Sequence, residues 1–172
     1  GMPKFGPEIN LNFENVIYYK NNEADKRLEN NWNNILKPVV DELDSVGVLE
    51  SEKHFGGMGV QYESEVIYHN MIEELEKKNV IFTSIEDAIK RYPDLVKKYF
   101  GKIVSYTENK FAALNATVFS GGSFIYVPKN TVLDRPLQSY FRINSKNMGQ
   151  FERTLIIVDD NSSLHYVEGC TA

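Results

Sequence analysis

The sequence predicts an α+β chain in which a mainly helical module, residues 1–110, precedes a β-rich segment, residues 111–172. Before residue 110, apolar residues recur at three- and four-residue steps, which is typical of amphipathic helices. After about residue 116, β-branched and aromatic runs alternate with Gly, Pro and Asp-Asn turns, which is typical of strands. The charge density also halves, because residues 1–110 carry 14 Lys/Arg and 19 Asp/Glu, whereas residues 111–172 carry 5 of each.

The composition indicates a folded protein that works away from nucleic acid and membranes. With 42% hydrophobic and 12% aromatic residues, the chain can bury a core. Its net charge of −5 comes without a dense Lys/Arg stripe, which argues against a nucleic-acid partner. No apolar run resembles a signal peptide or a membrane span. Cys170 is the only cysteine, so we expect a reducing, cytoplasmic location.

The N-terminal part is expected to begin with a polar, mobile arm over residues 3–30, with a short strand at 16–19. A first helix is predicted from about Asn33 to Val46, where apolar residues recur with helical spacing. Pro38 is tolerated in its first turn, and Gly47 can end it in a left-handed conformation.

A second helix is predicted after a glycine-rich loop at residues 51–59. Ser64 would cap it, and its apolar face would comprise Val66, Ile67, Met71, Ile72 and Leu75. A short strand at 80–82 should follow. Ser84 and Asp87 resemble a capping box for a further helix.

Two more helices and four strands complete the prediction. Pro93 should start a helix that ends at Gly101, and residues 111–114 suggest a short one. The four strands are expected at 124–127, 137–143, 152–158 and 163–168. Because no helices separate these strands, βαβ winding is excluded, and the pattern leaves a sandwich, a barrel and a stacked solenoid open.

Cys170 is the first candidate for chemistry. A thiol that follows glycine at a strand end can be exposed enough to form a thiolate, carry a persulfide or bind a soft metal. The alternative is an inert, partly buried cysteine. No CxxC or CxxH spacing surrounds it, which argues against a self-contained zinc or Fe–S site.

Arg142 and Asn144 lie two residues apart and should point to the same face of a strand. An arginine among apolar residues needs a partner, because an unpaired buried charge is costly. The guanidinium could lower a thiol pKa or hold an anionic intermediate. The alternative is a structural ion pair, with Glu152 or Glu168 as the suggested partner.

The remaining polar residues show no catalytic set. The three histidines share no spacing and are interpreted as structural or surface residues. The two glycine-rich segments, 56–59 and 120–123, lack the Lys-Ser/Thr of a phosphate-binding loop and are interpreted as turns.

Several blocks taken together resemble the SufB family of iron–sulfur cluster assembly scaffolds. They are residues 59–70 (GVQYESEVIYHN), 109–115 (NKFAALN), 121–129 (GGSFIYVPK), 140–144 (YFRIN), 148–158 (MGQFERTLIIV) and 165–172 (HYVEGCTA). They occur in the family's order with similar spacing. The resemblance covers most of the chain and is weakest before about residue 50.

The resemblance implies a specific architecture and a set of partners. An N-terminal helical module, residues 1–110, would be followed by the first rungs of a right-handed parallel β-helix, a truncated β-solenoid, at residues 111–172. The family works with a SufD-like paralogue and a SufC-like ATPase. Sulfur reaches it as persulfide from a cysteine desulfurase through a SufE- or SufU-like carrier.

The resemblance also implies roles for individual residues. Cys170 would lie on the route by which sulfur enters the β-helix, and Arg142 and Asn144 would line that route. Gln138 and Tyr140 are weaker candidates for the lining. The cofactor would be a transient Fe–S cluster, built only in the full-length complex, and a flavin is a further candidate.

The resemblance further implies that this chain lacks the family's later cysteine and the region that docks the ATPase. An exposed last rung should then make the chain self-associate, and a strictly monomeric species in light scattering would contradict this. We therefore expect a non-enzymatic scaffold and sulfur acceptor. The alternatives are a thiol-dependent sulfur transferase and a structural interaction domain with an inert cysteine.

Overall fold

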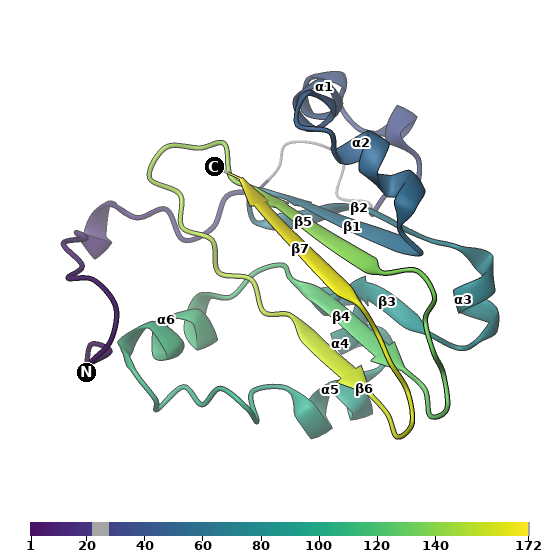
Figure 1. Cartoon of the computed structure of the whole chain (residues 1–172). Coiled ribbons are helices and arrows are strands. Elements are labelled where there is room, and N and C mark those ends of the chain that lie inside the picture. The colour runs from purple at the N-terminus through teal and green to yellow at the C-terminus, as the bar shows by residue number, and fades with distance from the viewer. Residues whose placement is uncertain (22–27, 172) are drawn as a thin grey trace.

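The computed structural model describes residues 1–21 and 28–171 and shows two β-sheets packed face to face (Figure 1). One sheet has four strands in the order β2-β1-β5-β7, and the other has three in the order β3-β4-β6. Residues 22–27, which belong to the arm expected at residues 3–30, and Ala172 lie outside the described residues.

The four-stranded sheet is built on a hairpin. Strands β1 (Gly57–Tyr62) and β2 (Glu65–Met71) are antiparallel and are joined by the two residues Glu63 and Ser64. Strand β5 (Leu137–Arg142) pairs with β1 in parallel, and β7 (Tyr166–Thr171) pairs with β5 in parallel. Among residues 1–21 and 28–171, β7 therefore pairs with β5 alone.

The three-stranded sheet is also mixed. Strand β3 (Ile81–Ser84) is antiparallel to β4 (Ser123–Val127), which pairs in parallel with β6 (Leu155–Val158). The expected right-handed parallel β-helix is therefore wrong, since each sheet contains an antiparallel pair. The physical reason is that strands from before residue 110 join both sheets. The Glu63-Ser64 turn folds β2 back on β1, which pairs with β5, and β3 pairs antiparallel with β4.

Short helices surround the two sheets, with their bounds as follows. The α-helices are α1 (Lys37–Ser45), α2 (Val48–Ser51), α3 (Glu73–Lys77), α4 (Ile85–Arg91), α5 (Pro93–Tyr99) and α6 (Lys110–Val118). The 3₁₀ turns are η1 (Phe13–Asn15), η2 (Trp32–Asn34) and η3 (Glu52–His54).

Some predicted helix boundaries are confirmed, but the first helix begins at Lys37 rather than at about Asn33, which lies in η2. Ser84 Oγ accepts a hydrogen bond from the Asp87 amide at 3.2 Å and caps α4. Pro38 lies in the first turn of α1, and Gly47 follows that helix with φ +80°. Helix α5 begins at Pro93 as expected.

The second predicted helix is the main error at the level of elements. Residues 65–71 form strand β2, and helix α3 begins only at Glu73. Val66, Ile67 and Tyr68 are β-branched or aromatic residues that fit a strand well, and β2 pairs along the whole of β1. Residues 16–19 form no strand, although Ile17 makes an isolated parallel bridge to Met148.

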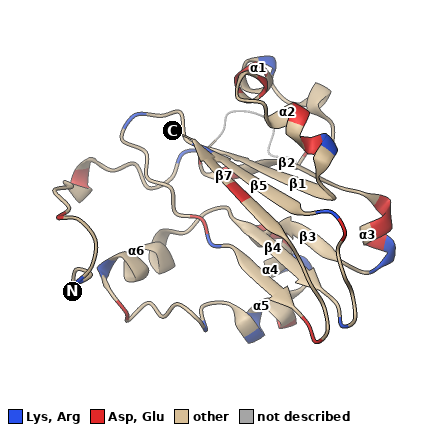
Figure 2. Ribbon diagram, in the orientation of Figure 1, with Lys and Arg blue, Asp and Glu red and all other residues tan. Residues whose placement is uncertain are grey.

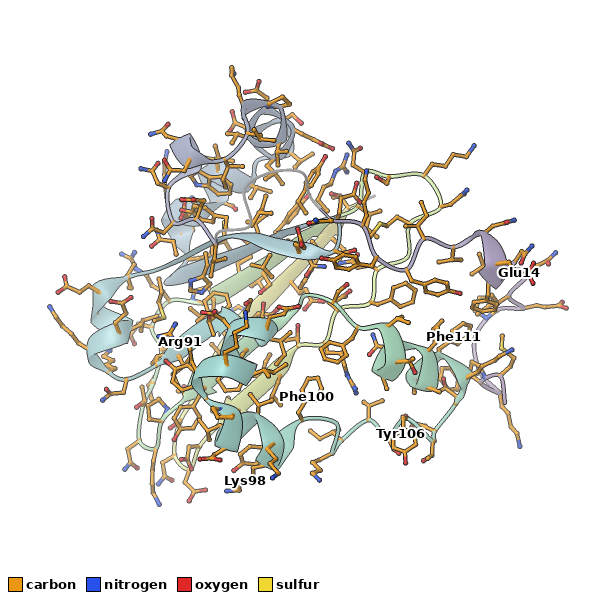
Figure 3. All side chains as sticks on the ribbon, turned by 180° about the vertical axis from the view of Figure 1, so that it is seen from behind. Glu14, Arg91, Lys98, Phe100, Tyr106 and Phe111 are labelled. Carbon is orange, nitrogen blue, oxygen red and sulfur yellow. The ribbon has the colours of Figure 1, made fainter. Side chains whose placement is uncertain are left out.

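The buried apolar residues form three clusters. Between α1, α2 and the four-stranded sheet, Leu43 and Val48 pack against strand residues such as Val60. Phe82 and Leu137 meet between the two sheets. On the far side, α4 and α5 cover the three-stranded sheet, as Figure 3 shows from behind, near the labelled Arg91, Lys98 and Phe100.

The charged side chains gather on helices and loops, whereas most strand positions are uncharged (Figure 2). Among residues 1–21 and 28–171, no helix has both the length and the apolar character that crossing a membrane requires. The few charged residues on strands therefore stand out, and they include Arg142 on β5 and Glu168 on β7.

Candidate functional site

Strand β5 presents Gln138, Tyr140 and Arg142 on the face that α1 and α2 cover, because alternate strand residues point to the same side. Gln138 Oε1 accepts a hydrogen bond from Ser51 Oγ at 3.2 Å. The Tyr140 hydroxyl lies 2.8 Å from Thr171 Oγ1 on the neighbouring strand. We call this side of the four-stranded sheet the outer face.

Arg142 pairs with Glu42 of helix α1 on the outer face. Its Nε donates to Glu42 Oε1 at 2.8 Å, and its terminal nitrogen lies 2.6 Å from the same oxygen. The two side chains are only 18% and 22% exposed, so water screens this pair weakly. Arg142 therefore forms a structural ion pair, the alternative considered from the sequence. Its partner is Glu42 rather than Glu152 or Glu168.

Asn144 joins the same polar network through Tyr62. Its side-chain Nδ2 donates to the Tyr62 hydroxyl at 3.1 Å, and that hydroxyl donates to Glu42 Oε2 at 3.0 Å. Burial raises the pKa of Tyr62, and the negative charges of Glu42 and Glu63 act in the same direction. Arg142 thus contacts Glu42 directly, and Asn144 reaches the same carboxylate through Tyr62, so that the two side chains lie on one side of the sheet.

Glu63 forms a second centre of this network and is only 3% exposed. Its φ of +56° places it in the left-handed region at the β1–β2 turn. Its carboxylate accepts hydrogen bonds from the Ser145 hydroxyl at 2.5 Å and the Asn144 amide at 3.5 Å, and the Lys20 ammonium lies 3.6 Å away. Sequence reasoning missed Glu42 and Glu63, because their partners are distant along the chain.

Cys170 lies on the opposite side of the sheet from Arg142. The register pairs Cys170 with Phe141 and Thr171 with Arg142, and directly paired residues share a face. Cys170 therefore faces the three-stranded sheet, on what we call the inner face. The structure brings Arg142 and Asn144 together and separates both of them from Cys170.

The charged groups that act on the thiol are acidic. Burial raises the pKa of Cys170, and the negative charges of Glu168 and Glu152 raise it further. Burial also raises the pKa of Glu152, with a smaller effect from Glu168. The Cys170 residue as a whole is nevertheless exposed. The pKa shift is thus opposite to the one that a neighbouring Arg142 would produce.

The structure also shows where other candidates lie. The His69 imidazole meets the Phe82 ring edge-on with centroids 4.7 Å apart, and burial lowers its pKa to about 4, so it is neutral at pH 7. Across residues 1–21 and 28–171, no three His, Cys, Asp or Glu side chains are grouped as metal ligands would be.

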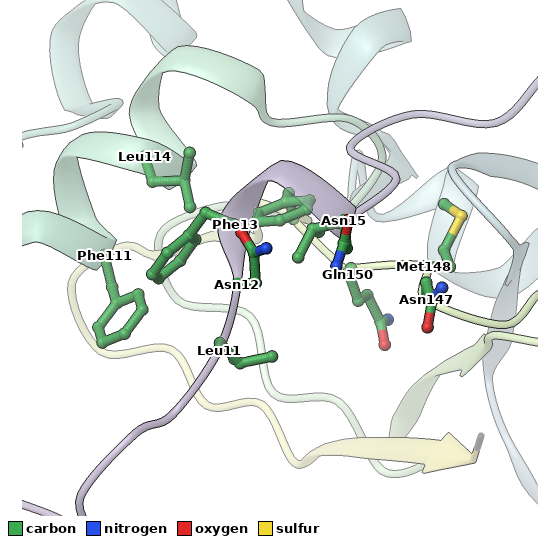
Figure 4. Close-up of a pocket in the computed structure, with 12 residues that line it drawn as sticks. Leu11, Asn12, Phe13, Asn15, Phe111, Leu114, Asn147, Met148 and Gln150 are labelled. Carbon is green, nitrogen blue, oxygen red and sulfur yellow. The ribbon is translucent and has the colours of Figure 1, made fainter.

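A pocket of about 450 Å³ lies between the N-terminal arm, α6 and residues 147–151 (Figure 4). Its lining includes Phe13, Phe111, Met148 and Gln150 and contains no charged side chain. None of the predicted site residues lines it.

Comparison with known proteins gives a consistent result. A family model described as the SufBD protein N-terminal region matches residues 18–139. An iron–sulfur cluster assembly SufBD family protein of Staphylococcus aureus strain USA300 is 52% identical over 99% of this chain. The iron–sulfur cluster assembly protein SufB of Bacillus subtilis strain 168 is 50% identical over the same share. In both cases the chain spans 37% of the relative's length.

Proposed function

The chain belongs to the SufBD family, and from this premise we propose that it is a scaffold component of iron–sulfur cluster assembly whose Cys170 accepts sulfur. The observation that carries the proposal is the exposed position of Cys170, which follows Gly169 in strand β7. An accessible thiol can react with a persulfide, whereas a buried one cannot. The iron–sulfur cluster is cargo in this scheme.

The proposed reaction moves one sulfur atom without net oxidation. The Cys170 sulfur bonds to the terminal sulfur of a persulfide donor, and the donor's own sulfur–sulfur bond breaks. The donor leaves as a thiol, and Cys170 becomes a persulfide. A SufE- or SufU-like carrier, charged by a cysteine desulfurase, is the proposed donor.

The proposal assigns Arg142 and Asn144 to the outer face rather than to the sulfur step. Their contacts with Glu42 and Tyr62 support a role in holding α1 and the loop after β5 against the sheet. Work with a SufC-like ATPase and a SufD-like paralogue is proposed for the whole protein, since this chain spans 37% of the relatives' length.

Sulfur loading can be tested by intact-mass measurement after incubation with glutathione persulfide. We expect the wild-type chain to gain the mass of one sulfur atom, removable by a reductant. Cys170→Ser, which changes only the sulfur at an exposed position, should gain nothing. Equal loading of the two proteins, or loading of neither, would contradict the proposal, and turnover of a small acceptor would indicate a transferase instead.

A further inference from the structure

The pocket between the N-terminal arm, α6 and residues 147–151 has two chemically different ends. It encloses about 450 Å³, a size typical of small-molecule sites. Phe13 and Phe111 lie at one end, with their ring centroids 6.0 Å apart, and Asn147 and Gln150 lie at the other (Figure 4). Every described residue of the lining is apolar, a glycine or an amide. The pocket therefore matches a neutral molecule with an apolar body and a polar end.

The amide of Gln150 marks the polar end. Its Nε2 is buried and makes no hydrogen bond among the described residues. A buried N–H donor without an acceptor is costly, so folded proteins usually supply one. A turn about the last side-chain torsion, which is soft in glutamine, presents this donor to the pocket that Gln150 lines. A ligand oxygen at this end would supply the missing acceptor.

The arm forms the opposite wall and is held there by the chain itself. The Ile17 amide donates to the Asn147 carbonyl at 2.9 Å, and the Gly149 amide donates to the Ile17 carbonyl at 3.0 Å. The Tyr18 hydroxyl donates to the Phe13 carbonyl at 2.7 Å, which fixes the turn that carries the Phe13 ring. Because these contacts preorganise the pocket, a ligand need not order the arm when it binds.

We propose that this pocket binds a neutral, largely apolar small molecule whose carbonyl oxygen accepts a hydrogen bond from the Gln150 amide. The apolar body contacts Phe13 and Phe111, and Met148 contributes its adaptable thioether to the wall. Cys170 does not line this pocket, so the proposal stands independently of the sulfur-accepting role.

Two neutral fluorescent probes that differ in their polar groups test the site. Nile red carries a carbonyl oxygen, whereas N-phenyl-1-naphthylamine carries no oxygen. Both should bind the wild-type chain saturably in a fluorescence titration. In Gln150→Leu, which keeps a side chain of similar size, Nile red should bind about tenfold more weakly, since one hydrogen bond is lost. The affinity for N-phenyl-1-naphthylamine should stay at its wild-type value.

Phe111→Ala tests the apolar end, because it removes one ring from the wall. Helix α6 contains no fully buried residue, so the fold should survive, and circular dichroism checks this. Both probes should bind about tenfold more weakly. Ile103→Ser is the matched control, since Ile103 is 92% exposed and lies outside the pocket lining. It should leave both affinities unchanged.

Three results would overturn the proposal. If neither probe binds the wild-type chain, or if Phe111→Ala binds both as tightly, the pocket is not a binding site. If Ile103→Ser weakens binding as much as Phe111→Ala does, the probes bind exposed apolar surface instead. If Gln150→Leu changes the affinities of the two probes equally, or changes neither, the amide does not bind the ligand oxygen.

Discussion

Gly122→Ala is expected to lower the free energy of unfolding by about 3 kcal/mol or more, a large effect for the addition of one methyl group. Gly122 has φ +103°, a conformation that residues with a Cβ adopt at a cost. A Cβ there would lie 2.4 Å from the Arg153 carbonyl oxygen and 2.7 Å from its nitrogen. Backbone atoms cannot move aside as a flexible side chain can.

The contact matters because it is where β4 begins beside the segment that leads into β6. The Gly122 amide also donates to Gln61 Oε1 of β1 at 3.0 Å, which ties the two sheets together. Pushing Arg153 away would therefore disturb both the β4–β6 pairing and the contact between the sheets.

Gly47→Ala is the matched control for this prediction. Gly47 also has a positive φ, +80°, but a Cβ added there would meet nothing within 4 Å. The free energy of unfolding of Gly47→Ala should fall only by the cost of the left-handed backbone conformation, about 1 kcal/mol. Urea unfolding of the two variants measures the difference, and equal losses would show that the close approach at Gly122 does not constrain the fold.

Arg142→Met is expected to destabilise the chain by about 2–4 kcal/mol, because it leaves the Glu42 carboxylate half-buried without its cation. The Tyr62 hydroxyl would remain as a donor to Glu42. The loss of unfolding free energy should therefore be smaller than the loss expected for a buried charge with no partner at all. Urea unfolding midpoints at constant slope give the measurement.

Two controls separate this ion pair from general effects of charge. The double variant Glu42→Leu with Arg142→Met removes both charges and should recover much of the lost stability. Lys37→Met breaks the exposed Lys37–Asp41 pair on the same helix and should change stability little. An Arg142→Met loss no larger than that of Lys37→Met would mean that the outer-face network does not hold α1 in place.

The sequence predicted those elements that depend on local chemistry. Ser84 and Asp87 define a helix start through a contact three residues apart, and Pro93 and Gly47 act within their own turns. The strand at 124–127 was recognisable from its β-branched and aromatic residues between glycine and proline. None of these requires knowledge of a distant partner.

Strand β2 was missed because its pattern fits two structures. Apolar residues at 66, 67, 71, 72 and 75 have helical spacing, yet 66–68 are also strong strand residues. These residues form a strand because they pair with β1 from Gly57 to Tyr62. The predicted β-helix failed for a related reason. Strands β1, β2 and β3, which precede residue 110, join the two sheets and make both of them mixed, and local patterns do not reveal such distant pairing.

The candidate site also depends on contacts between distant segments, which local sequence patterns do not reveal. The spacing of Arg142 and Asn144 correctly placed them on one side, where both reach the Glu42–Tyr62 pair. Whether Cys170 shares that side depends on the register between β5 and β7. A shift of one residue would exchange the faces of every β7 side chain, and no local pattern determines it.

The separation of Arg142 from Cys170 is tested most directly by the pH dependence of Cys170 alkylation in the double variant Glu42→Leu with Arg142→Met. Since the guanidinium lies across the sheet from the thiol, we predict the same apparent thiol pKa as in the wild-type chain. An apparent thiol pKa that rises when Arg142 is removed would show that the two groups share a face, and would contradict their separation across the sheet.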